Sequence, residues 1–130
     1  MEGFMESRHI AREKAMICIY QLLLYPRSHK EVMENIFLED FDKIDEFAVT
    51  LVEHSMANKD RFAGYCNEVL DKWTFDRLGF VEQAILLVAC SEFDLKLNAV
   101  TVVIDEAVTF AKKYCDDDTY KLINGVLDKI

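Results

Sequence analysis

Three basic side chains near the start of the chain are the first candidates for binding chemistry. Arg8 and Arg12 are four residues apart, so on a helix they lie one turn apart and share a face, with His9 close by. Backbone N–H groups at the beginning of a helix add some affinity for anions. Phosphate is the ligand that such a patch favours. Two arginines make a weak patch, however, and an ordinary solvated helix end is the stronger interpretation of these residues taken alone.

Motifs for catalysis or metal binding are missing from the sequence. Its histidines have no second ligand at helical spacing within a carboxylate cluster, and no two cysteines form a C-x-x-C pair. Glycine-rich phosphate loops and the G-x-S-x-G motif are also missing. The sequence therefore predicts no metal, no cofactor and no catalysed reaction. The cysteines are expected to be reduced core residues, since three of them lie in apolar or helical patterns: Cys18, Cys66 and Cys90.

Two acidic stretches favour structural roles over catalytic or metal-binding roles. Asp105 and Glu106 are adjacent, so on a helix they point about 100° apart and do not converge on one substrate atom. They are expected on a solvated face. The run Asp116 to Asp118 lacks the ligand spacing of a calcium loop. It is rich in N-cap residues and is expected to introduce the last helix.

Composition limits the class of protein. A length of 130 residues favours a single domain, and 52% hydrophobic residues indicate a globular chain. Four glycines and one proline are too few for the many turns of an all-β fold. The net charge of −9 favours basic partners, so any binding of nucleic acid must depend on a local patch. No apolar stretch reaches the roughly 18 residues of a membrane span, and no secretory signal is visible, so a cytoplasmic location is expected.

Apolar residues at helical spacing predict seven helices. Residues 1–6 are expected to be a flexible tail, and residues 7–130 a single domain. Ser7 is the expected N-cap of a largely buried first helix over about 8–25, which Pro26 ends. The other helices are expected at about 29–38 after a capping box from Ser28, around 47–55, after Asn58, over about 80–95, around 100–114, and after Asp118. Trp73 is expected to pack at a corner.

The dipeptide Asn124-Gly125 near the end of the chain has two interpretations. It is a strong hairpin signal when alternating strands flank it. Here apolar residues recur at steps of three and four instead, at Leu122, Ile123, Val126, Leu127 and Ile130. This spacing places Asn124-Gly125 inside a helix, where the glycine suggests the close approach of another helix.

Several stretches of the chain resemble the NusB family of transcription antitermination factors. VIDEAVTFAKKY, an acidic turn and then YKLINGVLDKI are similar to the C-terminal signature of that family. RLGFVEQAILLVACSEF resembles its middle pattern, and RHIAREKAMICIYQ resembles its opening. The resemblance extends over about residues 7–130. It implies an all-α fold of about seven helices in two packed helical subdomains.

The resemblance also implies a function and a set of contacts. Proteins of this family bind a single-stranded boxA element in ribosomal RNA leader transcripts, together with a small-subunit ribosomal protein called NusE in this role. Together they act on the elongating RNA polymerase complex, and no reaction is catalysed. The residues that would face RNA are Arg8, His9, Arg12 and Tyr20 on the first helix, and Lys113, Tyr114, Asp118 and Lys121 near the last. Glu82 matches an acidic residue that meets the ribosomal partner.

Departures from the family pattern keep a second function open. His9 and Ile10 stand where basic residues are usual, and Leu122 stands where a Phe is usual. Leu87 replaces a common Arg, and Cys115 replaces a Gly, so the end of the sixth helix is expected to be strained or different. The alternative is therefore an interaction-only module of the same fold, which binds a protein or forms a homodimer with little affinity for RNA. An enzyme is a third interpretation, but no motif supports it.

Overall fold

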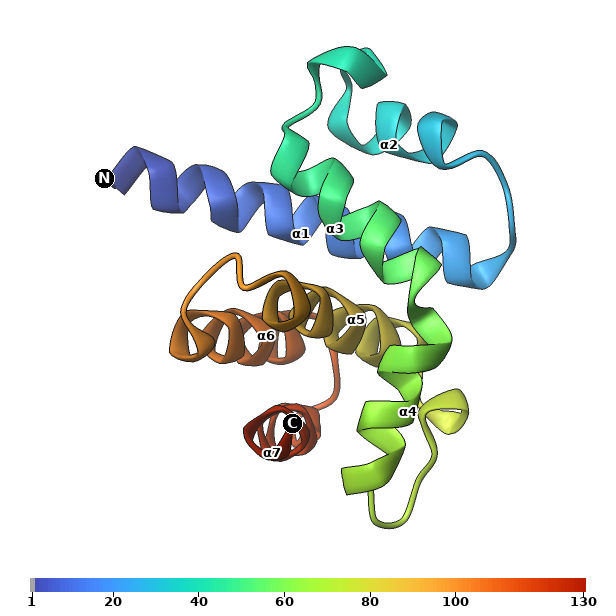
Figure 1. The fold of residues 1–130 in the computed structure, drawn as a ribbon, viewed down its shortest axis with the longest axis vertical. Coiled ribbons are helices and arrows are strands. Elements are labelled where there is room, and N and C mark those ends of the chain that lie inside the picture. Colours follow the sequence, from blue (N-terminus) through green and yellow to red (C-terminus); the bar gives the residue numbers. More distant parts are fainter. Residues whose placement is uncertain (1) are drawn as a thin grey trace.

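The computed structural model describes the backbone of residues 2–130 and the side chains from Ser7 onward, and every regular element within them is helical (Figure 1). The predicted all-α fold is confirmed. The α-helices are α1 (Glu2–Leu24), α2 (His29–Phe37), α3 (Glu46–Ala57), α4 (Lys59–Val69), α5 (Phe80–Leu95), α6 (Val100–Tyr114) and α7 (Thr119–Lys129). Two short 3-10 helices, η1 (Phe41–Lys43) and η2 (Phe75–Arg77), lie between them.

The helices form two groups that meet along α1 and α5. Helices α2 and α3 pack on α1, and α6 and α7 pack beside α5 (Figure 1). Both α1 and α3 also contact α5, so one continuous core joins the groups. Ten residues of α5 are buried, from Gln83 to Glu92, as expected for a helix that is apolar on nearly every side. No helix in the described part of the chain is long and apolar enough to cross a membrane.

Local sequence signals set most helix ends. Helix α5 begins and ends at the predicted residues, and the hydroxyl of Ser28 accepts a hydrogen bond from the backbone N–H of Glu31 at 3.2 Å, which caps α2. The predicted cap at Ser7 is wrong, because α1 begins at Glu2 and residues 2–6 continue the same helix. Asn58 occupies an N-cap position as expected, and Asp118, in the acidic run that was expected to introduce the last helix, occupies another, but neither side chain makes a cap hydrogen bond.

The C-terminal dipeptide lies in the middle of α7, so the helical interpretation of Asn124-Gly125 is confirmed. The predicted close approach at Gly125 is wrong, because a Cβ placed there would meet no atom within 4 Å. Trp73 does not pack at a corner either, since it is 57% exposed. Cys115 ends α6 in an extended conformation, with φ of −115° and ψ of 176°, so this end is different rather than strained. Cys18, Cys66 and Cys90 are buried and free, as predicted.

Candidate nucleic-acid interface

A buried ion pair fixes the N-terminal half of α1 against the second half of the chain. The guanidinium of Arg12 donates from Nε to Oε2 of Glu92 at 2.6 Å, and from Nη2 to Oε1 at 2.8 Å. Its Nη1 donates to Oε1 of Glu106 at 2.6 Å. The Arg12 side chain is 3% exposed and that of Glu92 is 0% exposed. The predicted phosphate contact of Arg12 would therefore require this cluster to open, because its donors already face carboxylates.

Charge and hydrogen bonding within the cluster favour the ionised state of Arg12. Burial alone would lower the pKa of Arg12, but the hydrogen bonds and charges of Glu92 and Glu106 outweigh it and raise this pKa above its ordinary value. Asn98, in the loop between α5 and α6, donates to Oε1 of Glu92 at 2.6 Å. Among the described residues, no buried side-chain nitrogen or oxygen lacks a hydrogen-bond partner. A fully satisfied buried network of this kind suits a structural role.

Arg8 and His9 extend the cluster toward the surface. The guanidinium carbon of Arg8 lies 4.1 Å from the centroid of the Phe47 ring, and Nη1 donates to Oδ1 of Asn98 at 3.4 Å. Nδ1 of His9 lies 2.8 Å from Oε2 of Glu106. The structure thus brings the predicted basic residues of α1 together at the junction with α3, α5 and α6. Each of them contacts a polar or aromatic group of another helix or loop.

The expectation that Glu106 lies on a solvated face is wrong. Its side chain is only 18% exposed and holds both Arg12 and His9, whereas its neighbour Asp105 is exposed as predicted. Glu92 was not predicted as a site residue from the sequence. A signal for it was present, because Glu92 is an acidic residue in the most apolar helix of the chain, where an ionised group needs a buried partner.

A second cluster joins α1 to the end of α6. Oε2 of Glu13 accepts hydrogen bonds from Nζ of Lys113 at 2.6 Å and from the Tyr114 hydroxyl at 2.5 Å. Burial alone would raise the pKa of Glu13, but these two bonds outweigh it and lower the pKa below its ordinary value. Burial and the bond to Glu13 raise the pKa of Tyr114. Two predicted RNA contacts therefore lie against α1, held by a carboxylate that was not predicted as a site residue.

The other predicted RNA contacts lie apart from these two clusters. Asp118 and Lys121 form an exposed ion pair, with 3.4 Å between Oδ1 and Nζ, where α7 begins. Tyr20 is half-buried against the core, two turns beyond Arg12 along α1. Within the described residues, no hydrogen bond or ion pair connects Asp118, Lys121 or Tyr20 to the residues around Glu13. Such an arrangement suits an extended ligand rather than a small molecule.

Glu82, the predicted protein contact, lies in the first turn of α5 and faces the end of α6. Burial and then the charge and hydrogen bond of Glu82 raise the pKa of the Cys115 thiol to about 12. Cys115 also lines a hollow of about 700 Å³ with Trp73, Leu122 and residues 116–119. An exposed tryptophan and three neighbouring aspartates therefore surround this hollow beside Glu82.

Comparison with known proteins places this arrangement in a family. A family model described as the NusB family matches residues 9–130. The chain belongs to the NusB family. The transcription antitermination protein NusB of Oceanobacillus iheyensis is 37% identical over 128 residues, which cover 95% of this chain and 98% of that protein. The protein of the same name from Shouchella clausii is 35% identical over 125 residues, which cover 93% of this chain and 91% of that protein.

Solved structures of NusB share the fold. A crystal structure of the antitermination factors NusB and NusE in complex with double-stranded RNA matches with a TM-score of 0.83 and 27% identity, and the match covers 95% of each chain. T. maritima NusB matches with a TM-score of 0.80 and 24% identity over 93% of this chain and 87% of that one, a likeness of fold alone. The predicted all-α fold agrees with both.

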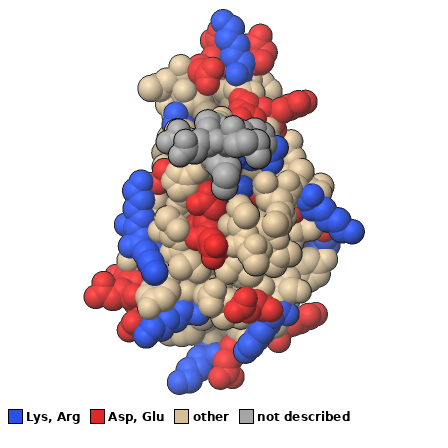
Figure 2. Space-filling view, turned by 90° about the vertical axis from the view of Figure 1, so that its left-hand side faces the viewer, with Lys and Arg blue, Asp and Glu red and all other residues tan. Residues whose placement is uncertain are grey.

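The face of this NusB family chain shown in Figure 2 carries mixed charge. On the face shown in Figure 2, basic and acidic side chains alternate, and a group of acidic side chains lies near the centre between uncharged areas. Three of the predicted RNA-binding cations, Arg12, Lys113 and Lys121, each lie within 3.4 Å of a carboxylate oxygen. The local positive potential is therefore much smaller than a count of lysines and arginines suggests.

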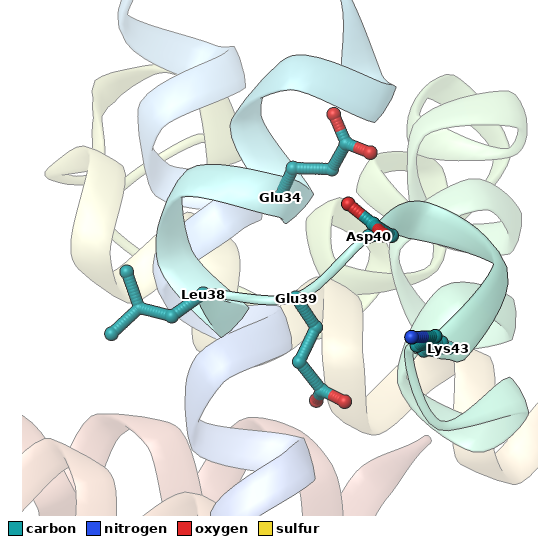
Figure 3. A pocket seen from close by; sticks show the side chains of 5 residues that line it. All are labelled: Glu34, Leu38, Glu39, Asp40 and Lys43. Atoms are coloured by element: carbon teal, nitrogen blue, oxygen red, sulfur yellow. The ribbon is translucent and has the colours of Figure 1, made fainter.

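A different hollow, at the far end of α2, offers no competing site. It has a volume of about 510 Å³ and is lined by Glu34, Leu38, Glu39, Asp40 and Lys43. Figure 3 shows that its three carboxylates point in different directions and that Leu38 points away from them. Glu34 already accepts the backbone N–H of Phe41 at 2.9 Å. Among the described residues, no group of three acidic, histidine or cysteine side chains could hold a metal ion.

Proposed function

We propose that this protein is an antitermination adaptor that binds boxA-type single-stranded RNA of ribosomal RNA transcripts together with the ribosomal protein NusE. The observation that carries the proposal is the match to NusB proteins over nearly the whole chain, including one solved with NusE and RNA. Two predicted RNA contacts of α6, Lys113 and Tyr114, also lie against α1, because both are bonded to Glu13. The adaptor would act in the cytoplasm on the elongating RNA polymerase, and the chain itself would catalyse no reaction.

The ion pairs between these cations and carboxylates of the chain would explain a need for a protein partner. Affinity for RNA phosphates depends on Lys and Arg charges that are not already neutralised. The exposed side chains of Lys113 and Lys121 have carboxylates beside them, and the whole chain has a net charge of −9. A basic ribosomal protein would add positive charge near the RNA. The hollow that contains Trp73 and Asp116, beside Glu82, has the acidic and aromatic character that suits such a partner.

Titration of labelled boxA-type RNA, with and without NusE, tests this function. Binding should be weak for the chain alone and tighter with NusE, and both affinities should fall as salt rises from about 50 to 200 mM. A double-stranded RNA of the same sequence should be included, because the matching solved complex contains double-stranded RNA. Failure of the single-stranded RNA to bind under either condition would contradict the proposal.

Two variants distinguish a direct contact of Lys113 with RNA from a long-range effect of charge. Lys113→Ala should weaken binding and reduce the slope of log K against log salt by about 0.7, the value for one phosphate contact on a single strand. Lys30→Ala removes the same charge from the exposed side of α2 and should change neither quantity appreciably. Equal losses in both variants would indicate a long-range charge effect instead of a contact.

The second candidate function is an interaction-only module that binds a protein or forms a homodimer. The observation that favours it is that Arg12 and Lys113 are each already bonded to a carboxylate of this chain. Light scattering at micromolar concentration distinguishes the two functions together with the titration. A homodimer that does not bind RNA favours the module, and a monomer that binds RNA with NusE favours the adaptor.

A further inference from the structure

A carboxylate among predicted RNA contacts is unexpected, because it repels phosphate. Glu13 occupies this position, between the basic end of α1 and two residues of α6, and its side chain is only 17% exposed. Its removal would increase the positive potential there. The position of Glu13 therefore calls for a function other than attraction of the RNA backbone.

The hydrogen bonds of Glu13 leave half of its carboxylate available. Both bonds, from Lys113 and from Tyr114, end on Oε2. Among the described residues, no hydrogen bond ends on Oε1. The two anchoring bonds and partial burial fix the group, and its pKa lies below the ordinary value, so it is an ionised acceptor at neutral pH. It can accept further hydrogen bonds but cannot donate one.

The neighbours of Glu13 supply the other parts of a nucleotide site. Tyr114 is 40% exposed, and Nζ of Lys113 lies 5.2 Å from the centroid of its ring, so a base would stack on the side of the ring away from Lys113. The ammonium of Lys113, 57% exposed, can reach a phosphate while it contacts Glu13. An aromatic face, a cation and a fixed acceptor are the groups with which proteins hold an unpaired base of single-stranded RNA.

We infer that Glu13 is a specificity-determining residue that accepts hydrogen bonds from an unpaired guanine stacked on Tyr114. The inference depends on the proposed RNA-binding function. Guanine presents two adjacent donors, N1–H and the N2 amino group, on its Watson–Crick edge. Uracil presents one N–H between two carbonyl oxygens, which a carboxylate repels. Glu13 thus weakens the attraction of this site for phosphate but allows it to discriminate between bases.

A structural tether is the alternative role of Glu13, because its bonds join α1 to α6. A tether predicts that changes at Glu13 alter stability, or alter affinity for all RNA sequences equally. Base reading predicts that affinity changes at one nucleotide position and for some bases only. The two roles therefore differ in a quantity that binding experiments measure directly.

The test uses the full chain with NusE and a set of boxA-type RNAs in which a guanine replaces each position in turn. At one position, the wild type should prefer guanine over uracil by about tenfold, and replacement of that guanine by inosine, which lacks the N2 amino group, should remove much of the preference. Glu13→Gln should reduce the preference to threefold or less, because the amide turns a donor toward the base. Affinity for the uracil form should be unchanged or higher, since a negative charge is lost.

Asp105→Asn is the matched control, because it removes an exposed carboxylate from α6 without touching the cluster. It should leave the guanine preference intact. Tyr114→Phe, which retains the ring but removes the hydroxyl that anchors Glu13, should reduce the preference partly, and it serves if Glu13→Gln does not fold. Equal profiles for wild type and Glu13→Gln at every position overturn the inference while RNA binding stands. Loss of binding by all proteins to all RNAs, with NusE present, overturns the proposed function and the inference together.

Discussion

Removal of the Arg12 guanidinium should destabilise the fold strongly. In Arg12→Ala, the carboxylate of Glu92 stays in the interior with Asn98 as its remaining side-chain donor, and Glu106 keeps only His9. Removal of one partner from a buried ion pair costs about 3–5 kcal/mol, because the surviving charge loses its compensation. For a chain of this length, 1 kcal/mol corresponds to roughly 3–5 °C in Tm, so the melting temperature should fall by about 10 °C or more.

Urea unfolding followed by far-UV circular dichroism at neutral pH measures this change, and an unchanged m value confirms that stability alone has changed. The double variant Arg12→Met with Glu92→Leu removes both charges and should recover most of the loss, because apolar side chains of similar volume often replace a buried pair without net cost. A change below about 1 kcal/mol in Arg12→Ala would refute the argument. It would mean that Glu92 is hydrated or that the cluster opens easily, and a direct contact of Arg12 with RNA would then become tenable.

Three further changes test other parts of the structure. Gly125→Ala should raise the free energy of unfolding by about 0.5–1 kcal/mol in urea titration, because the added Cβ meets no atom within 4 Å and suits a helix interior; a loss would restore the predicted close contact. Leu38→Gly should raise it by up to about 1 kcal/mol, since Leu38 is 85% exposed with φ of 57°; a loss would show that Leu38 packs in solution. Bonds from Arg61 and then His54 lower the pKa of Asp94, so the stability that Asp94 adds is present above about pH 5 and is lost as pH falls through its unfolded-state value of about 3.9 and below. The difference in Tm between wild type and Asp94→Asn should therefore be small at neutral pH, shrink below pH 4, and diminish in salt; a constant difference would exclude this linkage.

Helices were predictable because their signals are local. The spacing of apolar residues along α5 and α7, and the hydroxyl of Ser28 before α2, are properties of a few neighbouring residues. Where a prediction depended on packing between distant helices, it failed. Gly125 gave no indication of what lies opposite it, and the exposed side of Trp73 depends on how the segment after α4 returns to α5.

The pairing of charges could be predicted only in part, because the partners are 80–100 residues apart in the sequence. One local signal was nevertheless available. Arg12 lies on the same face of α1 as Ala15, Met16 and Ile19, all of which are buried. An arginine on an apolar face requires a buried acceptor, so its presence among these residues already argues against free exposure to phosphate. Because Arg12 and Glu92 are far apart in the sequence, only the identity of that acceptor could not be predicted.

Ion pairs within the chain change how a basic motif in an acidic protein should be interpreted. Salt dependence of RNA binding reports the counterions that the RNA releases when lysines and arginines neutralise its phosphates, and the charge of a lysine 2.6 Å from a carboxylate is already partly neutralised. The exposed ammonium of Lys113 can reach a phosphate while its bond to Oε2 of Glu13 holds that carboxylate in place to meet a base. Attraction of the backbone and discrimination between bases are then coupled through one side chain, which a count of lysines and arginines in the motif cannot reveal.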